Sequence, residues 1–317
     1  MPIKPIRQIV PKTQISATGA AWTTGSVLDL SAKFPTSALA NLYLGLYADN
    51  KTDEALDTEI INELVSKIYL WEQTHGSILD LSGFDYFMLS KFFFGKYQLP
   101  LFGDVADNAE RYLVFPLMFE HPKFPGTGFP SVPAGKAVLQ VTLGASSNVD
   151  GADYDVYGEF ALSEPSSIIT ALTQNYVPTQ TGTKLKIPLR AVGRCAGILL
   201  YGTTIRTTIQ SMKLYLNDAE LGIEVNDLLA KGISQLRNNF GDIYRKFAIY
   251  QKVPSAAADN GPASLPSAVE WIADAMNYTW LDFTDDPIDV AGKKFEIEGI
   301  FGDTNAVRII PVEIIPV

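Results

Sequence analysis

Four aspartates near the C-terminus carry the clearest metal-ligand chemistry in this sequence. Asp282, Asp285, Asp286 and Asp289 could together offer oxygen ligands to a hard cation such as calcium. Their spacing does not follow the EF-hand loop, so a solvated acidic turn is the favoured interpretation. A cation site remains the alternative.

Other residue types that could do chemistry are scarce. The two histidines, His75 in a predicted turn and His121 at the head of a proline-rich loop, have no metal-ligand spacing around them. The single cysteine, Cys195, lies in the apolar segment 194–200, which is typical of a buried side chain. No phosphate-binding loop, nucleophile elbow or distinct carboxylate pair stands out. We therefore predict a protein that is not an enzyme, with no catalytic, cofactor-binding or metal-binding residues.

The composition indicates a globular protein with an acidic body. Hydrophobic residues make up 47% of the 317 residues and charged residues 19%, and the net charge is −10. An acidic body repels phosphate groups, so direct nucleic acid binding is disfavoured. The sequence has no apolar segment of membrane-spanning length and begins without a signal peptide, so we expect synthesis in the cytoplasm.

Alternation of apolar and polar residues is the dominant pattern. Leu185, Ile187 and Leu189 alternate with polar residues, as in a half-buried strand. Many short strands separated by Gly- and Pro-containing turns favour sandwiches or barrels. The predicted strands are 42–47, 112–119, 139–143, 153–160, 184–190, 198–201, 278–283, 294–298 and 307–315.

A strand pair followed by a helix occurs twice. Residues 68–81 predict two strands and a turn, and Ser82 begins a helical run that ends at Gly95. Residues 212–225 repeat this order, and Asn226 begins a second run that ends at Gly241. A repeat of two long units predicts two similar domains, 1–167 and 168–317, with 168–176 as a connector. Further helices are predicted over 55–67 and from Ser267.

Two long loops and the two ends of the chain could contact partners. The loops 121–133 and 253–266 are either partner contacts or ordinary ordered excursions. Lys4, Arg7 and Lys12 form an extended basic arm, which either contacts an acidic partner or anionic lipid or is a disordered terminus. The apolar segment 309–317 is either a last strand or a tail that packs under a neighbouring subunit.

This organisation resembles the double jelly-roll major capsid proteins of icosahedral viruses with an internal membrane. The paired units 68–95 and 212–241 carry the resemblance, together with the strands that follow each unit. In length the chain is closest to the corticovirus-like and Flavobacterium lipid-containing phage proteins. The implied fold is all-β, with two tandem eight-stranded jelly-roll β-barrels and a few short helices.

The resemblance implies a structural coat protein of a bacteriophage virion. Three copies would form a pseudo-hexagonal capsomer that has no catalytic site and no cofactor. Its partners would be neighbouring capsomers, penton and minor capsid proteins and, through the basic arm, the viral membrane.

The main alternative is a trimeric phage spike or a carbohydrate- or receptor-binding β-sandwich protein. Exposed aromatic side chains on one loop, such as Phe124 and Phe129, would favour it. A two-domain enzyme of the cupin type needs a cluster of metal-binding histidines, and the two histidines disfavour that class.

Overall fold

The structure is a computed structural model of the full chain. It describes residues 3–16, 27–50, 65–95, 110–144, 149–202, 208–226 and 277–317. These residues form two compact units that divide between Ile169 and Thr170, and Val317 belongs to the first unit.

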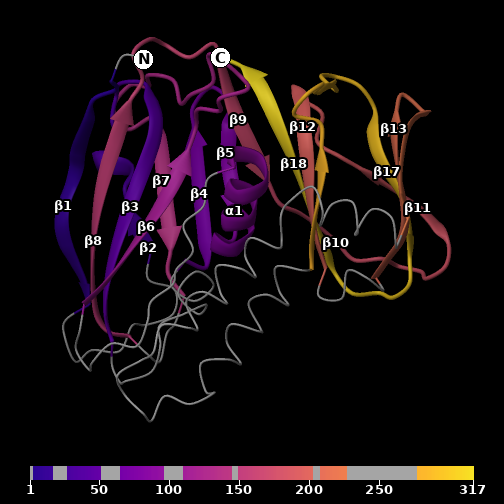
Figure 1. The fold of residues 1–317 in the computed structure, drawn as a ribbon, viewed down its shortest axis with the longest axis horizontal. Coiled ribbons are helices and arrows are strands. Elements are labelled where there is room, and N and C mark those ends of the chain that lie inside the picture. Colours follow the sequence, from indigo (N-terminus) through magenta and orange to yellow (C-terminus); the bar gives the residue numbers. More distant parts are fainter. Residues whose placement is uncertain are drawn as a thin grey trace, which may run out of the picture. The chain divides into compact units, whose positions relative to one another are not determined.

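The first unit contains one four-stranded antiparallel sheet and four strands of a larger sheet (Figure 1). One sheet has the order β1-β8-β3-β6 and the other contains β2-β7-β4-β5. Numbered along the chain, this is the strand order of an eight-stranded jelly roll. The strands are β1 (Ile6–Ser16), β2 (Val27–Asp29), β3 (Leu39–Asn50), β4 (Lys67–Glu72), β5 (Gly76–Leu81), β6 (Glu110–Met118), β7 (Ala137–Thr142) and β8 (Val149–Phe160).

The second unit repeats this plan. One sheet contains β9-β18-β12-β15, with β10 beside β18 and β16 beside β12, and the other has the order β11-β17-β13-β14. The strands are β9 (Ser167–Leu172), β10 (Gln174–Tyr176), β11 (Lys184–Pro188), β12 (Arg194–Gly202), β13 (Ile209–Leu216), β14 (Ala219–Asn226), β15 (Tyr278–Asp282), β16 (Ile288–Asp289), β17 (Phe295–Phe301) and β18 (Val307–Pro316).

The predicted repeat is confirmed at its hairpins. The strands β4 and β5 pair antiparallel, as do β13 and β14 at the equivalent place in the second unit. The second hairpin turns at Asn217 and Asp218, whose φ angles of 51° and 65° suit the paired left-handed positions of a type I′ turn.

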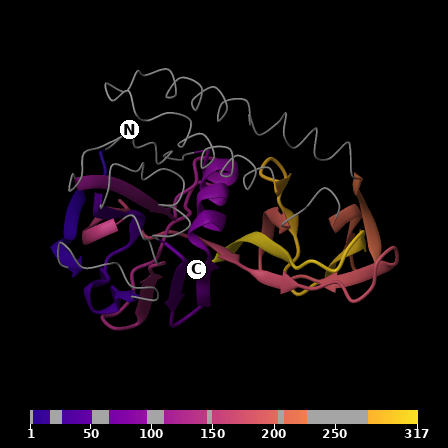
Figure 2. The same ribbon diagram turned by 90° about the horizontal axis from the view of Figure 1, so that it is seen from below.

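A helix follows the first hairpin, as the sequence predicts. The Ser82 hydroxyl accepts the Asp85 N–H at 3.0 Å and caps α1 (Gly83–Leu89), which continues into the π-helical turn η3 (Ser90–Phe94). The left-handed Gly95, with φ 64°, ends it. The helix α1 lies beside β5 and is buried along its whole length (Figure 2).

Some predicted elements lie outside the described residues. They are the helix after Asn226, the helix from Ser267 and the loop 253–266. Of the predicted helix 55–67, only the last three residues are described, and these are not helical because Lys67 begins β4.

The predicted strands are all present, and five further strands were missed. The missed strands are β1, β2, β9, β10 and β16. The predicted connector 168–176 is wrong, because it forms β9 and β10, and Ile168 and Ile169 are buried. Its run of β-branched residues is typical of a strand.

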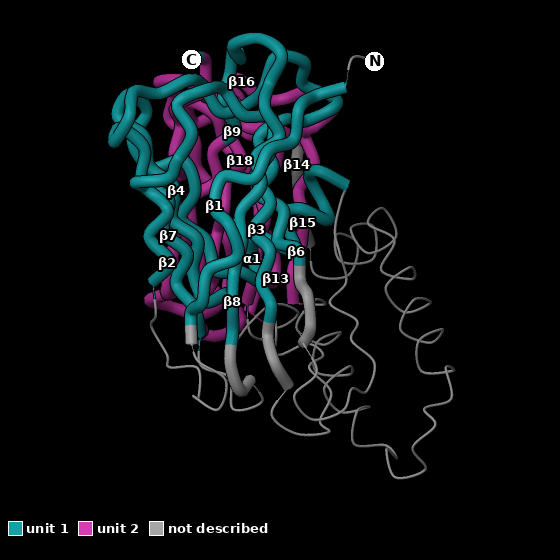
Figure 3. Tube along the Cα trace, turned by 90° about the vertical axis from the view of Figure 1, so that its left-hand side faces the viewer, with its two compact units in different colours: residues 1–169, 247–271, 317 teal, residues 170–246, 272–316 magenta. Residues whose placement is uncertain are grey.

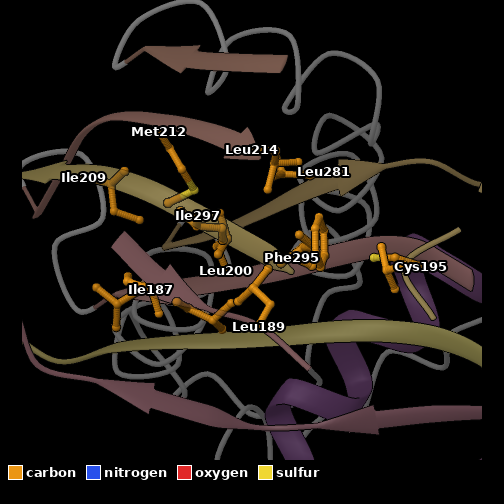
Figure 4. Close-up of a cluster of buried hydrophobic side chains, with 14 of the residues drawn as sticks. Ile187, Leu189, Cys195, Leu200, Ile209, Met212, Leu214, Leu281, Phe295 and Ile297 are labelled. Atoms are coloured by element: carbon orange, nitrogen blue, oxygen red, sulfur yellow. The ribbon is translucent and has the colours of Figure 1, made fainter. Parts of the chain in front are cut away.

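Alternation decides which side of each strand faces the core. In β3, Leu42, Leu44 and Leu46 are at most 2% exposed, whereas Tyr43 and Tyr47 lie on the opposite side of the sheet. In the second unit, inward side chains from both sheets meet in one cluster, which includes Leu200, Leu214 and Ile297 (Figure 4). These two cores hold the outward side chains of each sheet in fixed positions.

The apolar C-terminal segment is a strand of the second unit. β18 pairs with β12 along its length and with β10 at Val307–Ile309, and Val307, Ile309, Ile310 and Val312 are wholly buried. The alternative of a strand is therefore confirmed. Among the described helices, none is long and apolar enough to cross a membrane.

Candidate functional site

In the predicted aspartate cluster, Asp282 and Asp289 accept hydrogen bonds from residues of their own turns. Asp282 accepts the backbone N–H and the hydroxyl of Thr284 at 2.9 and 2.6 Å. The Asp289 carboxylate accepts a hydrogen bond from the Lys293 ammonium at 2.7 Å. This hydrogen bond holds the pKa of Asp289 below its ordinary value. Within the described ranges, no group of three or more His, Cys, Asp or Glu side chains is placed to hold a metal ion.

Cys195 is a buried side chain of β12. It is 0% exposed, and its thiol donates to the Gly197 carbonyl at 3.4 Å. Burial raises the pKa of this thiol to about 12, so almost none of it is thiolate at neutral pH. The side chain therefore packs as a small apolar group.

The two histidines support loops. The buried Glu72 carboxylate accepts the backbone N–H groups of Thr74 and His75 and contacts the His75 ring, so His75 belongs to the β4–β5 turn as predicted. His121 is buried, with Nε2 2.8 Å from the Phe93 carbonyl and Nδ1 accepting the Lys123 N–H at 3.1 Å. The Lys123 donor requires Nδ1 to be the acceptor, so Nε2 carries the proton.

The loop 121–133 is packed against the first unit. Phe124 is 9% exposed and Phe129 is 0% exposed. Phe124 contacts the His121 ring, and Phe129 packs on Phe34 and Phe119, with centroid distances of 5.0 and 5.4 Å. These two side chains are therefore not the exposed aromatic groups that would favour a carbohydrate-binding protein, and the loop is an ordered excursion.

The basic residues of the N-terminal arm contact the body of the first unit. The arm is extended as predicted, and it forms β1 at the edge of the β1-β8-β3-β6 sheet. Lys4 pairs with Glu120, Lys12 pairs with Asp153 at 3.4 Å, and Arg7 lies over the Phe160 ring. The alternative of a disordered terminus is wrong for residues 3–16.

One sheet surface was not singled out from the sequence. The outward side of β3 and β8, in the sheet toward which Figure 3 looks, carries tyrosines and buried carboxylates. We call it the tyrosine face, and it comprises Asn41, Tyr43, Tyr47, Asp153, Asp155, Tyr157 and Glu159. The sequence pattern that could have indicated this surface is the alternation of tyrosines with leucines in β3.

The tyrosine face is held by hydrogen bonds between these two strands. Tyr43 and Asn41 donate to the same Glu159 oxygen at 2.6 and 2.7 Å, and Tyr47 donates to Asp155 at 2.8 Å. Burial, assisted by the bond to Glu159, raises the pKa of Tyr43 to about 12. The Tyr43 hydroxyl therefore stays protonated and fixed as a donor.

A second polar sheet surface lies on the outward side of β11, β13 and β17. We call it the lysine face, and it comprises Lys184, Lys186, Lys213, Tyr215, Glu296 and Glu298. The lysine side chains are 66%, 42% and 28% exposed, whereas Glu298 and Glu296 are only 13% and 10% exposed. Lys184 and Lys186 are therefore more accessible than Glu298 and Glu296, whereas Lys213 pairs with Glu220, which is 40% exposed.

Solved structures share this arrangement of strands along nearly the whole chain. The STIV MCP, from Sulfolobus Turreted Icosahedral Virus, matches with a TM-score of 0.60 at 12% identity over 97% of each chain. The chain has the double jelly-roll fold. The double jelly roll is also matched by the PBCV-1 virus capsid, with a TM-score of 0.56 at 10% identity over 99% of this chain and 94% of that one.

A bacteriophage protein gives a similar match. The major capsid protein of bacteriophage PM2 matches the double jelly roll with a TM-score of 0.52 at 10% identity over 97% of each chain. No protein-family model and no curated protein sequence matches the chain. At these identities the likeness establishes the fold.

Proposed function

We propose that this chain is the major capsid protein of an icosahedral virus and forms pseudo-hexagonal homotrimeric capsomers. The supporting observation is that two jelly rolls follow one another in a single chain, as in the STIV MCP over 97% of both chains. Two similar barrels in each of three copies give six similar corners, which can tile a hexagonal lattice. Head-to-tail contacts between copies close into such a ring when the rotation suits.

The mass of the purified native chain tests this proposal. We expect light scattering to give a stable species near three times 34.7 kDa, and electron microscopy of the concentrated protein to show hexagonal outlines. A monomer at high concentration would contradict the proposal.

The proposed role is structural and not enzymatic. Its support is that the described Asp282, Asp289, Cys195 and both histidines have packing or turn-forming roles. We propose the domain limits 1–167 and 168–317, which lie close to the division of the two compact units between Ile169 and Thr170.

The proposed location is the virion shell of a bacteriophage, after synthesis in the host cytoplasm. The proposed partners are other copies of the chain, penton proteins and minor capsid proteins, without direct contact to nucleic acid. The net charge of −10 supports the last point, because an acidic protein repels the genome.

We further propose that the N-terminal arm meets the viral membrane. Ile3 and Ile6 support this contact, because they are 93% and 60% exposed beside Lys4 and Arg7. Deleting the arm would remove an edge strand, so Ile3→Ser with Ile6→Ser is the better test. The variant should float less with vesicles of phosphatidylcholine and phosphatidylserine than the unchanged chain. Equal flotation would contradict the membrane contact.

The observation that would favour a spike or a carbohydrate-binding protein is not made at Phe124 and Phe129. That alternative depended on exposed aromatic side chains in the loop 121–133, and Phe124 and Phe129 are buried there. We therefore retain the capsid role alone.

A further inference from the structure

The tyrosine face contains buried acceptors that need a donor. Asp155 is 2% exposed and Asn41 is 5% exposed, and within the described part of the chain the Oδ1 atom of each has no hydrogen-bond partner. An acceptor removed from water without a donor is unfavourable. A partner that covers this face and brings donors would remove this penalty.

The charge of the face defines what the partner should carry. Asp153, Asp155 and Glu159 lie on this side of β8, and Lys12 pairs with Asp153. The carboxylates of this face favour a cationic surface on the partner. The half-buried rings of Tyr43, Tyr47 and Tyr157 add the aromatic area that is typical of the centre of a protein interface.

The same chain carries a surface of that kind. On the lysine face, Lys184 and Lys186 are more exposed than Glu298 and Glu296, the carboxylates beneath them, although Lys186 also lies 3.9 Å from the exposed Asp218. Lys186 also lies over the Tyr215 ring at 4.7 Å, so an aromatic group is available there too. Each face spans a four-stranded sheet.

We propose that in the capsomer the tyrosine face of one copy packs against the lysine face of the next copy. This inference rests on the proposed function, because it assigns the contact that joins copies of the chain. Lysine donors from one copy would meet the acceptors Asp155, Asn41 and Asp153 of its neighbour. Such a contact joins two different surfaces, so repetition closes a ring when the rotation between copies suits.

Two charge variants of the full chain test the contact separately. The tyrosine-face variant is Asp153→Lys with Tyr157→Lys, and the lysine-face variant is Lys184→Glu with Lys186→Glu. The matched control is Lys136→Glu, an exposed lysine in the turn before β7. Light scattering across a concentration series measures the association of each protein.

We expect each face variant to dissociate at a concentration at least about tenfold higher than the unchanged chain, and the control to behave like the unchanged chain. Mixing the two face variants should then give a heterodimer near two times 34.7 kDa and larger mixed species, because one unchanged pair of faces remains and the two altered faces carry opposite charges. This rescue separates a contact between two different faces from a contact between two identical ones.

Several results would overturn the inference. If the unchanged chain and both face variants are all trimeric, the proposed contact is wrong and the proposed function stands. If the unchanged chain is monomeric, both proposals are wrong. Loss of association in only one variant, absence of the heterodimer, or specific binding of an oligosaccharide by the tyrosine face would assign that face to another partner. Circular dichroism checks that each variant folds. If the double lysine-face variant does not fold, the single change Lys184→Glu replaces it, because the Lys184 side chain is 66% exposed.

Discussion

The Glu313 carboxylate accepts the backbone N–H of Val192 at 2.8 Å, from a position that is 0% exposed within β18. The same oxygen accepts the Gly193 N–H at 3.2 Å, and the other oxygen lies 3.6 Å from the Arg190 guanidinium. A single buried side chain therefore holds the segment between β11 and β12 against the last strand.

Replacing Glu313 with Ala should be strongly destabilising. The change leaves the part-buried Val192 N–H and the buried Gly193 N–H without this acceptor, and Arg190 without its carboxylate. We expect the free energy of unfolding to fall by about 2–4 kcal/mol in a urea titration. Glu313→Gln keeps an acceptor oxygen and should lose less. An equal loss in both variants would contradict this role of the acceptor.

His121 should stabilise the loop 121–133 through both ring nitrogens. His121→Phe keeps a ring against Phe93, at a centroid distance of 4.3 Å, but removes the bonds to the Phe93 carbonyl and the Lys123 N–H. We expect this variant to lose about 1–3 kcal/mol of stability in thermal or urea unfolding. His121→Ala should lose more, because it also removes the packed ring. Unchanged stability in His121→Phe would show that the two bonds contribute nothing.

The Asp218–Lys294 ion pair should make the β13–β14 hairpin sensitive to acid. The Lys294 ammonium, 2.7 Å away, holds the pKa of Asp218 below its ordinary value of 3.8. The folded state therefore binds this proton more weakly than the unfolded chain. The stabilisation is complete above the ordinary pKa and is lost as the pH falls through the folded pKa.

The comparison of Asp218→Asn with the unchanged chain measures this effect. The unchanged chain should be the more stable at about pH 6 and should lose that advantage toward about pH 3. Because the pair is exposed, about 1 M salt should also reduce the difference. A difference that does not vary with pH would contradict the role of the charge.

Cys195 should be unreactive in the folded protein. Burial raises the pKa of its thiol to about 12, so the reactive thiolate is rare at neutral pH. A disulfide reagent such as Ellman's reagent should label the native chain slowly and label one thiol per chain in denaturant. Rapid labelling of the native chain would show that β12 opens readily.

The local pattern of the sequence predicted much of the fold because its signals lie within a few residues. Leu42, Leu44 and Leu46 face the core, as their alternation requires, and Ser82 caps a helix as its position before an apolar run suggests. The predicted connector 168–176 covers the missed strands β9 and β10. The β-branched residues of β9 were the contrary signal.

The interaction surfaces depended on contacts between distant residues. Tyr43 could be placed outside the core from β3 alone, but its bond to Glu159 joins residues 116 positions apart and follows from the register of β3 against β8. Phe129 lies in a proline-rich loop, and it is buried because it packs against the rings of Phe34 and Phe119, which are distant in the sequence.

The sequence by itself determined an all-β chain with two similar halves, since alternation and hairpin turns are local properties of the backbone. Only the tertiary structure decided which polar residues support the fold and which remain for a partner. Both Glu313 and Asp155 are carboxylates on strands. Glu313 is a buried acceptor for the backbone N–H of Val192, whereas Asp155 lies on the outward side of its sheet and accepts the Tyr47 hydroxyl. The physical reason is that the environment of each carboxylate is set by strands paired across the sheet, whose register short-range patterns do not specify.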